Sequence, residues 1–243
     1  MLFRSSYTFI AAGQDHSVGI LTGGVGWAWG SNAYGQSNMP ALPSGLAWIR
    51  ASCGFHHTVA QRSDGSWVAF GNNSKQQCSL PALPAGMSYV QAAAFGFQTL
   101  LLRSDGRIIS WGEYQALPPA LPAGVEYVSA STRHQHALAL RSDGRVVGWG
   151  LDDFGQCSGV PALPLGMYYT AIATGYRHSI ALRNDGVLVG WGDNSYGQCG
   201  MSGMGNVAEI AAGSWFTLAR MTAGVINASG YNGDGQLFRS EEH

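Results

Sequence analysis

A unit of about 40 residues recurs along this chain. Segments 57–78 ("HTVAQRSDGSWVAFGNNSKQQC"), 136–157 ("HALALRSDGRVVGWGLDDFGQC") and 178–199 ("HSIALRNDGVLVGWGDNSYGQC") share one order of short words. Each unit contains a Trp-Gly motif or its equivalent. The residue before the glycine is Trp29, Phe70, Trp111, Trp149, Trp191 or Ser229, and these residues are 41, 41, 38, 42 and 38 positions apart. The histidine position gives the same spacings, at His16, His57, Gln98, His136, His178 and Phe216. Six such units account for the chain and predict one repeat domain over residues 1–243.

The sequence pattern of each unit is typical of short β-strands. Asp-Gly pairs such as Asp64-Gly65 and Asp143-Gly144 separate two apolar runs, which predicts hairpins with two-residue primed turns. The runs are too short and too β-branched for helices, and proline-rich connectors such as "PALPAG" join the units. We therefore predict an all-β chain without a helical domain, a single β-propeller of about six blades. A fragment of a seven-bladed ring is the alternative. The Trp-Gly column is expected to pack inside the fold.

Charge and cysteine content restrict the partners. The chain has 13 basic and 14 acidic residues, a net charge of −1, and only 11% charged residues. No basic face for phosphates is expected, so nucleic acid is not a predicted partner, and no apolar run is long enough to predict a membrane partner. Cys78, Cys157 and Cys199 occupy one column on different units, which predicts free thiols. Free thiols and the lack of a signal peptide favour an intracellular location, with secretion as the alternative.

Three words occur in order in these units: Gly-x-x-His-Ser/Thr, Asp-Gly, and Trp-Gly-x-Asn-x-x-Gly-Gln. With them the chain resembles the regulator of chromosome condensation family. The resemblance implies a propeller, most often with seven blades. It also implies an alternative function, guanine-nucleotide exchange on a small GTPase, although known exchange factors carry a wedge-like insertion and basic tails that this chain lacks. In length and lack of insertions the architecture is most similar to the propeller-type bacterial β-lactamase inhibitors, which bind their target through aromatic loop residues.

Catalytic and cofactor motifs give no positive signal. The repeated histidines fit a structural role, bonding neighbouring loops, because equivalent residues of adjacent blades lie about 10 Å apart, too far to share a zinc ion. The segment 203–208, "GMGNVA", matches a dinucleotide fingerprint in spelling but leads into a strand rather than a helix. We therefore predict a non-enzymatic chain with no cofactor and no metal.

Variable loop positions carry the functional prediction. Two positions inside Gly-x-x-His and two in the loop before Gly-Gln differ between units while their neighbours stay fixed, and aromatic residues are frequent there. Aromatic and arginine side chains are typical of protein-binding hot spots. We predict a non-catalytic scaffold or inhibitor-like module that binds another protein through one rim. The predicted partner-binding residues are Phe55, His56, Phe97, His134, Tyr176, Arg177, Trp215, Tyr34, Phe154 and Tyr196.

Overall fold

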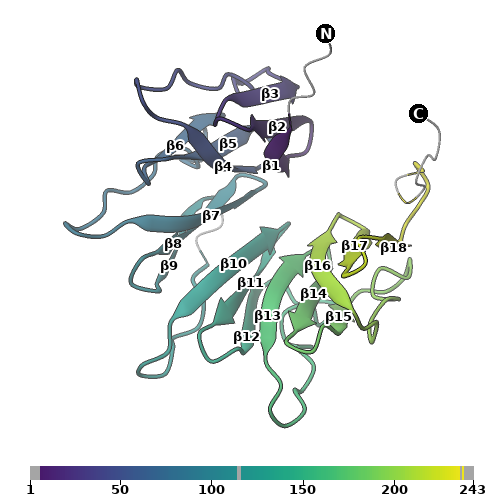
Figure 1. Cartoon of the computed structure of the whole chain (residues 1–243). Coiled ribbons are helices and arrows are strands. Elements are labelled where there is room, and N and C mark those ends of the chain that lie inside the picture. The colour runs from purple at the N-terminus through teal and green to yellow at the C-terminus, as the bar shows by residue number, and fades with distance from the viewer. Residues whose placement is uncertain (1–5, 114–115, 236, 238–243) are drawn as a thin grey trace. The chain divides into compact units, whose positions relative to one another are not determined.

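The computed structural model describes residues 6–113, 116–235 and 237 as antiparallel strands joined by turns and loops (Figure 1). The chain divides into two compact units, Met1–Leu117 and Pro118–His243. Unit 1 contains β1 (Tyr7–Ala12), β2 (His16–Leu21), β3 (Gly26–Gly30), β4 (Trp48–Cys53), β5 (His57–Arg62), β6 (Trp67–Gly71), β7 (Tyr89–Phe95), β8 (Gln98–Arg103) and β9 (Ile108–Gly112). Unit 2 contains β10 (Tyr127–Arg133), β11 (His136–Arg141), β12 (Val146–Gly150), β13 (Tyr169–Thr174), β14 (His178–Arg183), β15 (Leu188–Gly192), β16 (Val207–Ala212), β17 (Phe216–Met221) and β18 (Ile226–Gly230).

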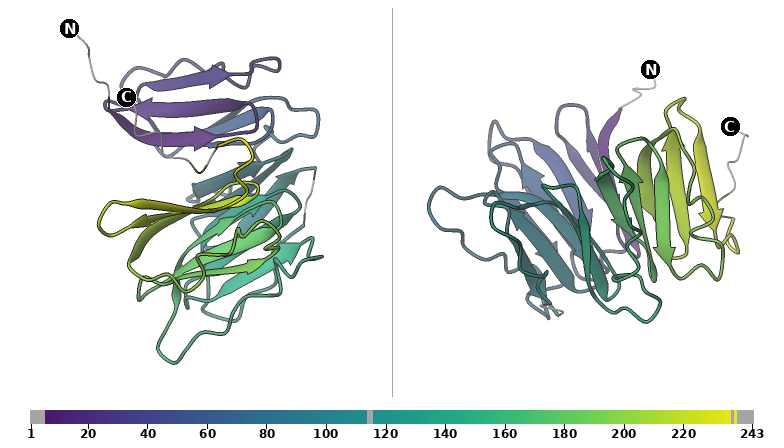
Figure 2. Two further views of the ribbon diagram at one scale, coloured as in Figure 1. Left: turned by 90° about the vertical axis from the view of Figure 1, so that its right-hand side faces the viewer. Right: turned by 90° about the horizontal axis from the view of Figure 1, so that it is seen from below.

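Each repeat forms one three-stranded antiparallel sheet, and we number the sheets 1 to 6 in chain order. Figure 2 shows the sheets from two further sides. The prediction of an all-β chain without a helical domain is confirmed for the described residues, and each repeat contributes three strands. Within that part of the chain, no helix is long and apolar enough to cross a membrane. The single domain over residues 1–243 stays a prediction.

Apolar residues from successive sheets make the core of each unit. In unit 1, Val18 and Ile20 of sheet 1 pack against Trp48, Ala51 and Ala60 of sheet 2. A second cluster joins sheets 2 and 3, and in unit 2 equivalent clusters join sheets 4 and 5 and sheets 5 and 6. The tryptophan of the Trp-Gly motif packs into the core in sheet 5, where Trp191 is 6% exposed. In sheet 1, however, the equivalent Trp29 is 49% exposed. The expected burial of the Trp-Gly column is therefore wrong for Trp29.

The connectors are closed by a tyrosine at the start of the next sheet. The Tyr89 hydroxyl donates to the carbonyl of Pro81 at 2.9 Å, and Tyr169 donates to Pro161 at the same distance. Leucines of the same proline-rich words, including Leu83 and Leu163, reach the core clusters. The "PALP" word is thus a packed connector between sheets.

The predicted two-residue primed turns are wrong. Arg62 N–H donates to Ser66 O at 2.9 Å, and Gly65 N–H donates to Arg62 O at 3.0 Å, so the loop has three residues. Gly65 has a φ of 84°, whereas Asp64 is not among the residues with positive φ. A turn that ends on one left-handed glycine is the three-residue hairpin with a bulge. Glycine is still required there, because only the residue after Asp adopts the left-handed conformation.

Candidate functional site

Two kinds of loop meet at one end of every sheet. In sheet 1 the register pairs His16 with Gly30, so the β1–β2 loop and the loop after β3 lie at the same end. The same pairing holds in sheets 2 to 6, for example His57 with Gly71 and His178 with Gly192. We call this the loop end of a sheet. The two variable loops therefore lie at the same end of each sheet.

Buried polar relays hold the loop ends of neighbouring sheets together. His16 Nε2 lies 2.8 Å from Thr58 Oγ1 of the next sheet, and that hydroxyl donates to the carbonyl of Gln36 at 2.9 Å. Because the threonine proton is used on the carbonyl, the histidine must be the donor through Nε2–H. The same relay recurs as His57–Thr99–Gln77 and His136–Ser179–Gln156. The histidines are therefore structural, and they bond hydroxyl groups of the next sheet.

The histidine rings are confined by the glycine that precedes them. A Cβ at Gly54 would lie 2.1 Å from Cε1 of His57, and one at Gly175 would lie 2.0 Å from Cε1 of His178. The glycine N–H also donates to the histidine carbonyl, at 2.9 Å for Gly54 and 2.8 Å for Gly175. These contacts explain the Gly-x-x-His word: only glycine leaves room for the ring beneath the turn.

Burial keeps these histidines neutral. Burial lowers the pKa of His57 to about 4, with a further contribution from the nearby His16. The pKa of His136 and of His178 is also lowered to about 4, chiefly by burial. Within the described residues, Nδ1 of these three rings has no hydrogen-bond partner. A second proton would therefore be placed in a buried site without an acceptor.

The loop after the third strand is fixed by its own side chains. Gln198 is fully buried, and its Oε1 accepts from the backbone N–H of Tyr196 at 2.9 Å. Asn194 Oδ1 accepts from Cys199 N–H at 2.8 Å. The same two bonds hold the loop of repeat 4, through Gln156 and Asp152. The Asn-x-x-Gly-Gln word thus builds a rigid loop that presents the residue two positions before the glutamine.

Aromatic cluster 1 gathers at the loop ends of unit 1. Phe55 contacts Phe95 and Phe97 edge-on, with ring centroids 4.9 and 5.9 Å apart. The centroid of the His56 ring lies 5.8 Å from that of Phe97 and 5.0 Å from that of Tyr34, which is exposed. All four residues predicted from this half of the chain, Tyr34, Phe55, His56 and Phe97, therefore lie in one cluster.

Aromatic cluster 2 gathers at the loop ends of unit 2. The Tyr176 ring lies between His134 and Trp215, at centroid distances of 3.9 and 4.6 Å. Tyr196 continues the row from Trp215 at 5.7 Å and reaches Tyr231 at 5.3 Å.

Arg177 extends cluster 2 to a sixth ring. Its Cζ lies 4.8 Å from the centroid of Phe154 and 5.5 Å from that of Tyr176. The six predicted residues of this half, His134, Tyr176, Arg177, Trp215, Phe154 and Tyr196, form one continuous surface cluster.

Two members of these clusters were not predicted from the sequence. Phe95 enters cluster 1 because the hairpin of repeat 3 is short: Phe95 pairs with Gln98, which leaves only Gly96 and Phe97 as loop residues. Tyr231 enters cluster 2 from the position directly after Gly230, where other repeats have small or polar residues or Leu151. Two sequence features could have indicated them. The segment "AAAFGFQ" has phenylalanine on both sides of its loop glycine, and in "YNGDGQ" the tyrosine stands at the start of the loop rather than two positions before the glutamine.

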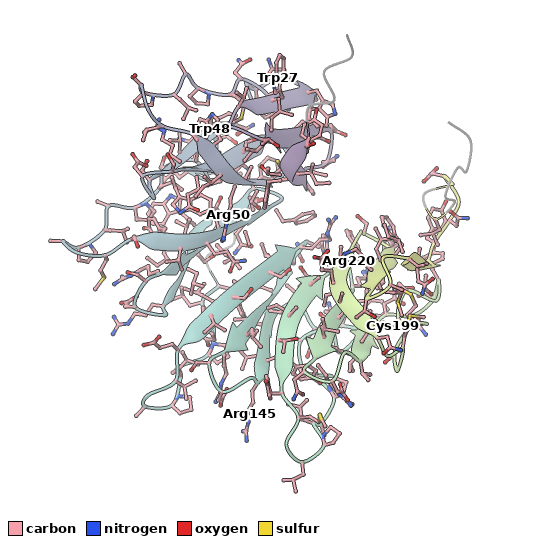
Figure 3. The ribbon with its side chains drawn as sticks, in the orientation of Figure 1. Trp27, Trp48, Arg50, Arg145, Cys199 and Arg220 are labelled. Atoms are coloured by element: carbon pink, nitrogen blue, oxygen red, sulfur yellow. The ribbon has the colours of Figure 1, made fainter. Side chains whose placement is uncertain are left out.

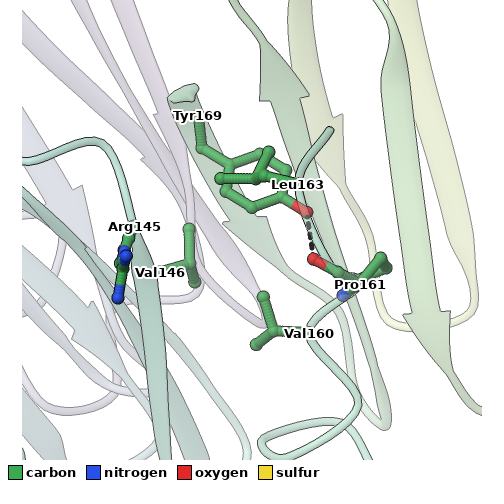
Figure 4. A pocket seen from close by; sticks show the side chains of 6 residues that line it. All are labelled: Arg145, Val146, Val160, Pro161, Leu163 and Tyr169. Carbon is green, nitrogen blue, oxygen red and sulfur yellow. Dashed lines mark hydrogen bonds between the residues drawn. The ribbon is translucent and has the colours of Figure 1, made fainter. Parts of the chain in front are cut away.

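A small cavity of unit 2 does not have the chemistry of a ligand site. Arg145, Val146, Val160, Pro161, Leu163 and Tyr169 line a cavity of about 260 Å³ (Figure 4). That volume is below the usual range for ligand pockets, and the Tyr169 hydroxyl is already bonded to Pro161. No group of three His, Cys, Asp or Glu residues in the described part could hold a metal ion. The four cysteines form no disulfide, and burial raises the pKa of Cys53 to about 12.

Comparison with known proteins identifies the repeat. The family model described as "Regulator of chromosome condensation (RCC1) repeat" matches residues 7–36, 128–156 and 169–198. The chain therefore contains RCC1 repeats. Each matched stretch runs from the first strand of a sheet to the buried glutamine of its last loop, so it contains both loops of the loop end. A search of curated proteins finds no match for this RCC1-repeat protein.

Solved structures show the fold of this RCC1-repeat protein to be propeller-like. Human WBSCR16 is 19% identical, with a TM-score of 0.77 over 98% of this chain and 79% of that one. Prp20p of Saccharomyces cerevisiae is 20% identical, with a TM-score of 0.76 over 92% and 71%. The CRINKLY ectodomain of the Arabidopsis thaliana receptor kinase ACR4 is 16% identical, with a TM-score of 0.70 over 93% and 82%. The predicted propeller class is confirmed.

Proposed function

We propose that this RCC1-repeat protein is a non-catalytic binding module that recognises another protein through aromatic clusters 1 and 2. The observation that carries the proposal is the gathering of aromatic side chains at the loop ends of both units. Tyrosine, tryptophan and arginine are the side chains that most often supply binding energy in protein interfaces. No cofactor, metal or reaction is part of the proposal.

The loops that present these rings support the proposal. Tyr196 and Phe154 are exposed at loop tips whose backbones are held by a buried glutamine and an Asn or Asp side chain. A side chain held before binding loses little conformational entropy when a partner covers it. A fixed loop end therefore suits specific binding better than a mobile loop would.

The charge of cluster 2 indicates the chemistry of the partner. Within the described residues no carboxylate lies within ion-pair distance of Arg177, whose guanidinium is stacked between Phe154 and Tyr176. A partner loop with an Asp or Glu beside an apolar residue would complement this surface, since guanidinium and carboxylate form strong paired hydrogen bonds. We propose an acidic segment of the partner at this position.

Relatives of the same fold are described as protein binders. One structure shows Kap60 bound to yeast RCC1 (Prp20), and another describes the binding of Prp20p to Gsp1p and histones. At about 20% identity these likenesses support a propeller that binds proteins, and the identity of this chain's partner stays open. None of the solved structures named above is a β-lactamase inhibitor, so an inhibitor-like role rests on the sequence prediction alone.

A matched pair of tyrosine variants tests the proposal. Tyr196 is 52% exposed at the loop end, and Tyr168 is 48% exposed at the opposite end of a sheet, before β13. A partner isolated from the source cells on immobilised wild-type protein is purified, and its affinity for each variant is measured by calorimetry. Tyr196→Ala should weaken binding about 30-fold or more, the effect of losing an interface anchor of about 2 kcal/mol, and Tyr168→Ala should leave it unchanged.

Two results would contradict the proposal. Unchanged affinity in Tyr196→Ala, Phe154→Ala and Tyr34→Ala would remove the loop ends as the binding surface. Weaker binding in Tyr168→Ala alone would assign the contact to the opposite end of the sheets. If the purified partner is a GTPase, faster nucleotide release on adding the wild-type protein would favour the alternative function, guanine-nucleotide exchange.

The proposed location is intracellular. Free cysteines are typical of a reducing compartment, and the four cysteines of this chain form no disulfide. Fractionation of the source cells tests the location directly, and recovery of the protein from the medium would overturn it.

A further inference from the structure

One face of sheet 1 is apolar and exposed, although the same face of sheet 2 is core. The register aligns Ile10, Gly19 and Trp27 in one row across the sheet, and Ala12, Ser17 and Trp29 in the next row on the same side. We call this side the open face of sheet 1. The opposite side carries Phe9, Ala11, Val18, Ile20 and Ala28, which pack against sheet 2.

The equivalent rows of sheet 2 show what such a face does elsewhere in unit 1. There the register aligns Ala51, Ala60 and Val68, and then Cys53, Thr58 and Phe70. The apolar members of both rows pack against sheet 1. On sheet 1 the same rows instead carry larger side chains that face solvent: Ile10 is 72% exposed and Trp27 is 59% exposed. The open face is thus an interface position that carries aromatic residues.

The aromatic residues of the open face form one continuous patch. Tyr7 and Trp29 both cover Gly19, because a Cβ built there would lie 2.4 Å from Tyr7 Cε1 and 3.3 Å from Trp29 Cζ3. Their ring centroids are 6.4 Å apart. Three partly exposed aromatic rings and Ile10 present on the order of 400 Å² of apolar surface. A patch of that size on a monomer is often an interaction site.

In contrast to the open face of sheet 1, one face of sheet 6 is charged. Its register aligns Glu209, Arg220 and Ile226 in one row. Arg220 Nε donates to Glu209 Oε2 at 2.9 Å, and Arg220 Nη2 lies 2.6 Å from Glu209 Oε1. Covering this pair with an apolar surface would remove two charges from water, which is costly. Trp27 and Arg220, both labelled in Figure 3, mark the apolar and the charged face.

We propose that the open face of sheet 1 binds the open face of sheet 1 in a second copy of this chain. Among the described residues this face holds no charged side chain, so two copies can meet there without leaving a charge unpaired. Contact between identical patches closes at two copies, whereas a contact of sheet 1 with sheet 6 of another copy would form a ring or a filament and would bury the ion pair of Glu209 and Arg220. Two such patches bury about 800 Å² together, which is typical of a weak dimer.

Analytical ultracentrifugation of the full chain at about 5 to 200 µM tests the proposal. The wild-type mass should rise with concentration from the monomer value of 25.7 kDa towards twice that value. Trp27→Lys should stay monomeric, because each dimer would bury two lysines on the contact. Ile226→Lys is the matched control, because Ile226 is also 59% exposed on the third strand of its sheet, and it should associate as the wild type does.

Each alternative result overturns the proposal. A wild-type protein that is monomeric at 200 µM would exclude the dimer. Association that survives Trp27→Lys would place the contact on another surface, and association lost in Ile226→Lys would indicate a head-to-tail contact. If Trp27→Lys does not fold, as judged by circular dichroism, Ile10→Lys on the same row replaces it in the same experiment.

Discussion

Acidification should destabilise this protein through its buried histidines. In the folded state the pKa values of His57, His136 and His178 are about 4, against an unfolded value near 6.5. Between these values the unfolded chain binds more protons than the folded chain. The free energy of unfolding therefore falls as the pH falls from about 6.5 towards 4.

The expected loss can be worked out for each ring. A histidine with these two pKa values lowers the free energy of unfolding by about 1.8 kcal/mol between pH 7 and pH 5. Three such rings amount to about 5 kcal/mol, a large part of the usual stability of a domain. Carboxylates with lowered pKa, such as Asp143 and Asp185, act below this window, because they stay ionised until the pH falls towards their folded pKa.

The assay is urea denaturation at pH 7 and pH 5 for the wild type and His178→Gln. Glutamine is the natural residue at this position in repeat 3, where Gln98 Nε2 donates to Ser110 Oγ at 2.7 Å. The variant should lose at most about one third of the acid sensitivity, because one of the three most strongly shifted rings is gone while His16 and His134, whose pKa values burial also lowers, remain. Equal pH dependence in the two proteins would refute the argument, as would a wild-type stability that does not change between pH 7 and pH 5.

Two further predictions concern the turns and the rigid loops. Gly144→Ala should destabilise the protein by about 2–4 kcal/mol, because the backbone is strained at a φ of 74° and the new Cβ would lie only 2.4 Å from Tyr168 Cβ. Gly65→Ala has a similar backbone strain, but its Cβ would meet no other atom. It should therefore cost only about 1–2 kcal/mol in the same urea titration. Equal costs would show that the contact with Tyr168 is unimportant. Gln156→Ala should weaken partner binding although it removes no aromatic ring, because the loop loses the acceptor for its backbone N–H; calorimetry that gives wild-type affinity would contradict a role for loop rigidity.

The repeat made most of the fold predictable from the sequence. Alternating apolar runs around Asp-Gly define the second and third strands, and His57 and His178 mark where the second strand begins. The ten candidate residues could be chosen from the sequence because they occupy variable positions between fixed ones, and their role in binding stays a prediction. Their division between two clusters was not predictable, since it depends on which loops belong to which compact unit.

The errors come from features that a repeat alone does not determine. Asp-Gly suits both a two-residue and a three-residue hairpin, and the choice depends on the register, which pairs Arg62 with Ser66. Trp29 has the sequence environment of a core residue, and its exposure results from its place on the first sheet. Phe95 was missed because a shortened loop moves its position into the strand.

Hydrogen–deuterium exchange of the protein with and without its purified partner tests the central claim most directly. The account predicts slower exchange at the loop ends, in segments 54–57, 151–157, 175–177 and 193–199, with no change at the Asp-Gly turns. Protection confined to the turns at 63–66 and 142–145 and to the proline-rich connectors would contradict it, because those segments lie at the opposite end of each sheet.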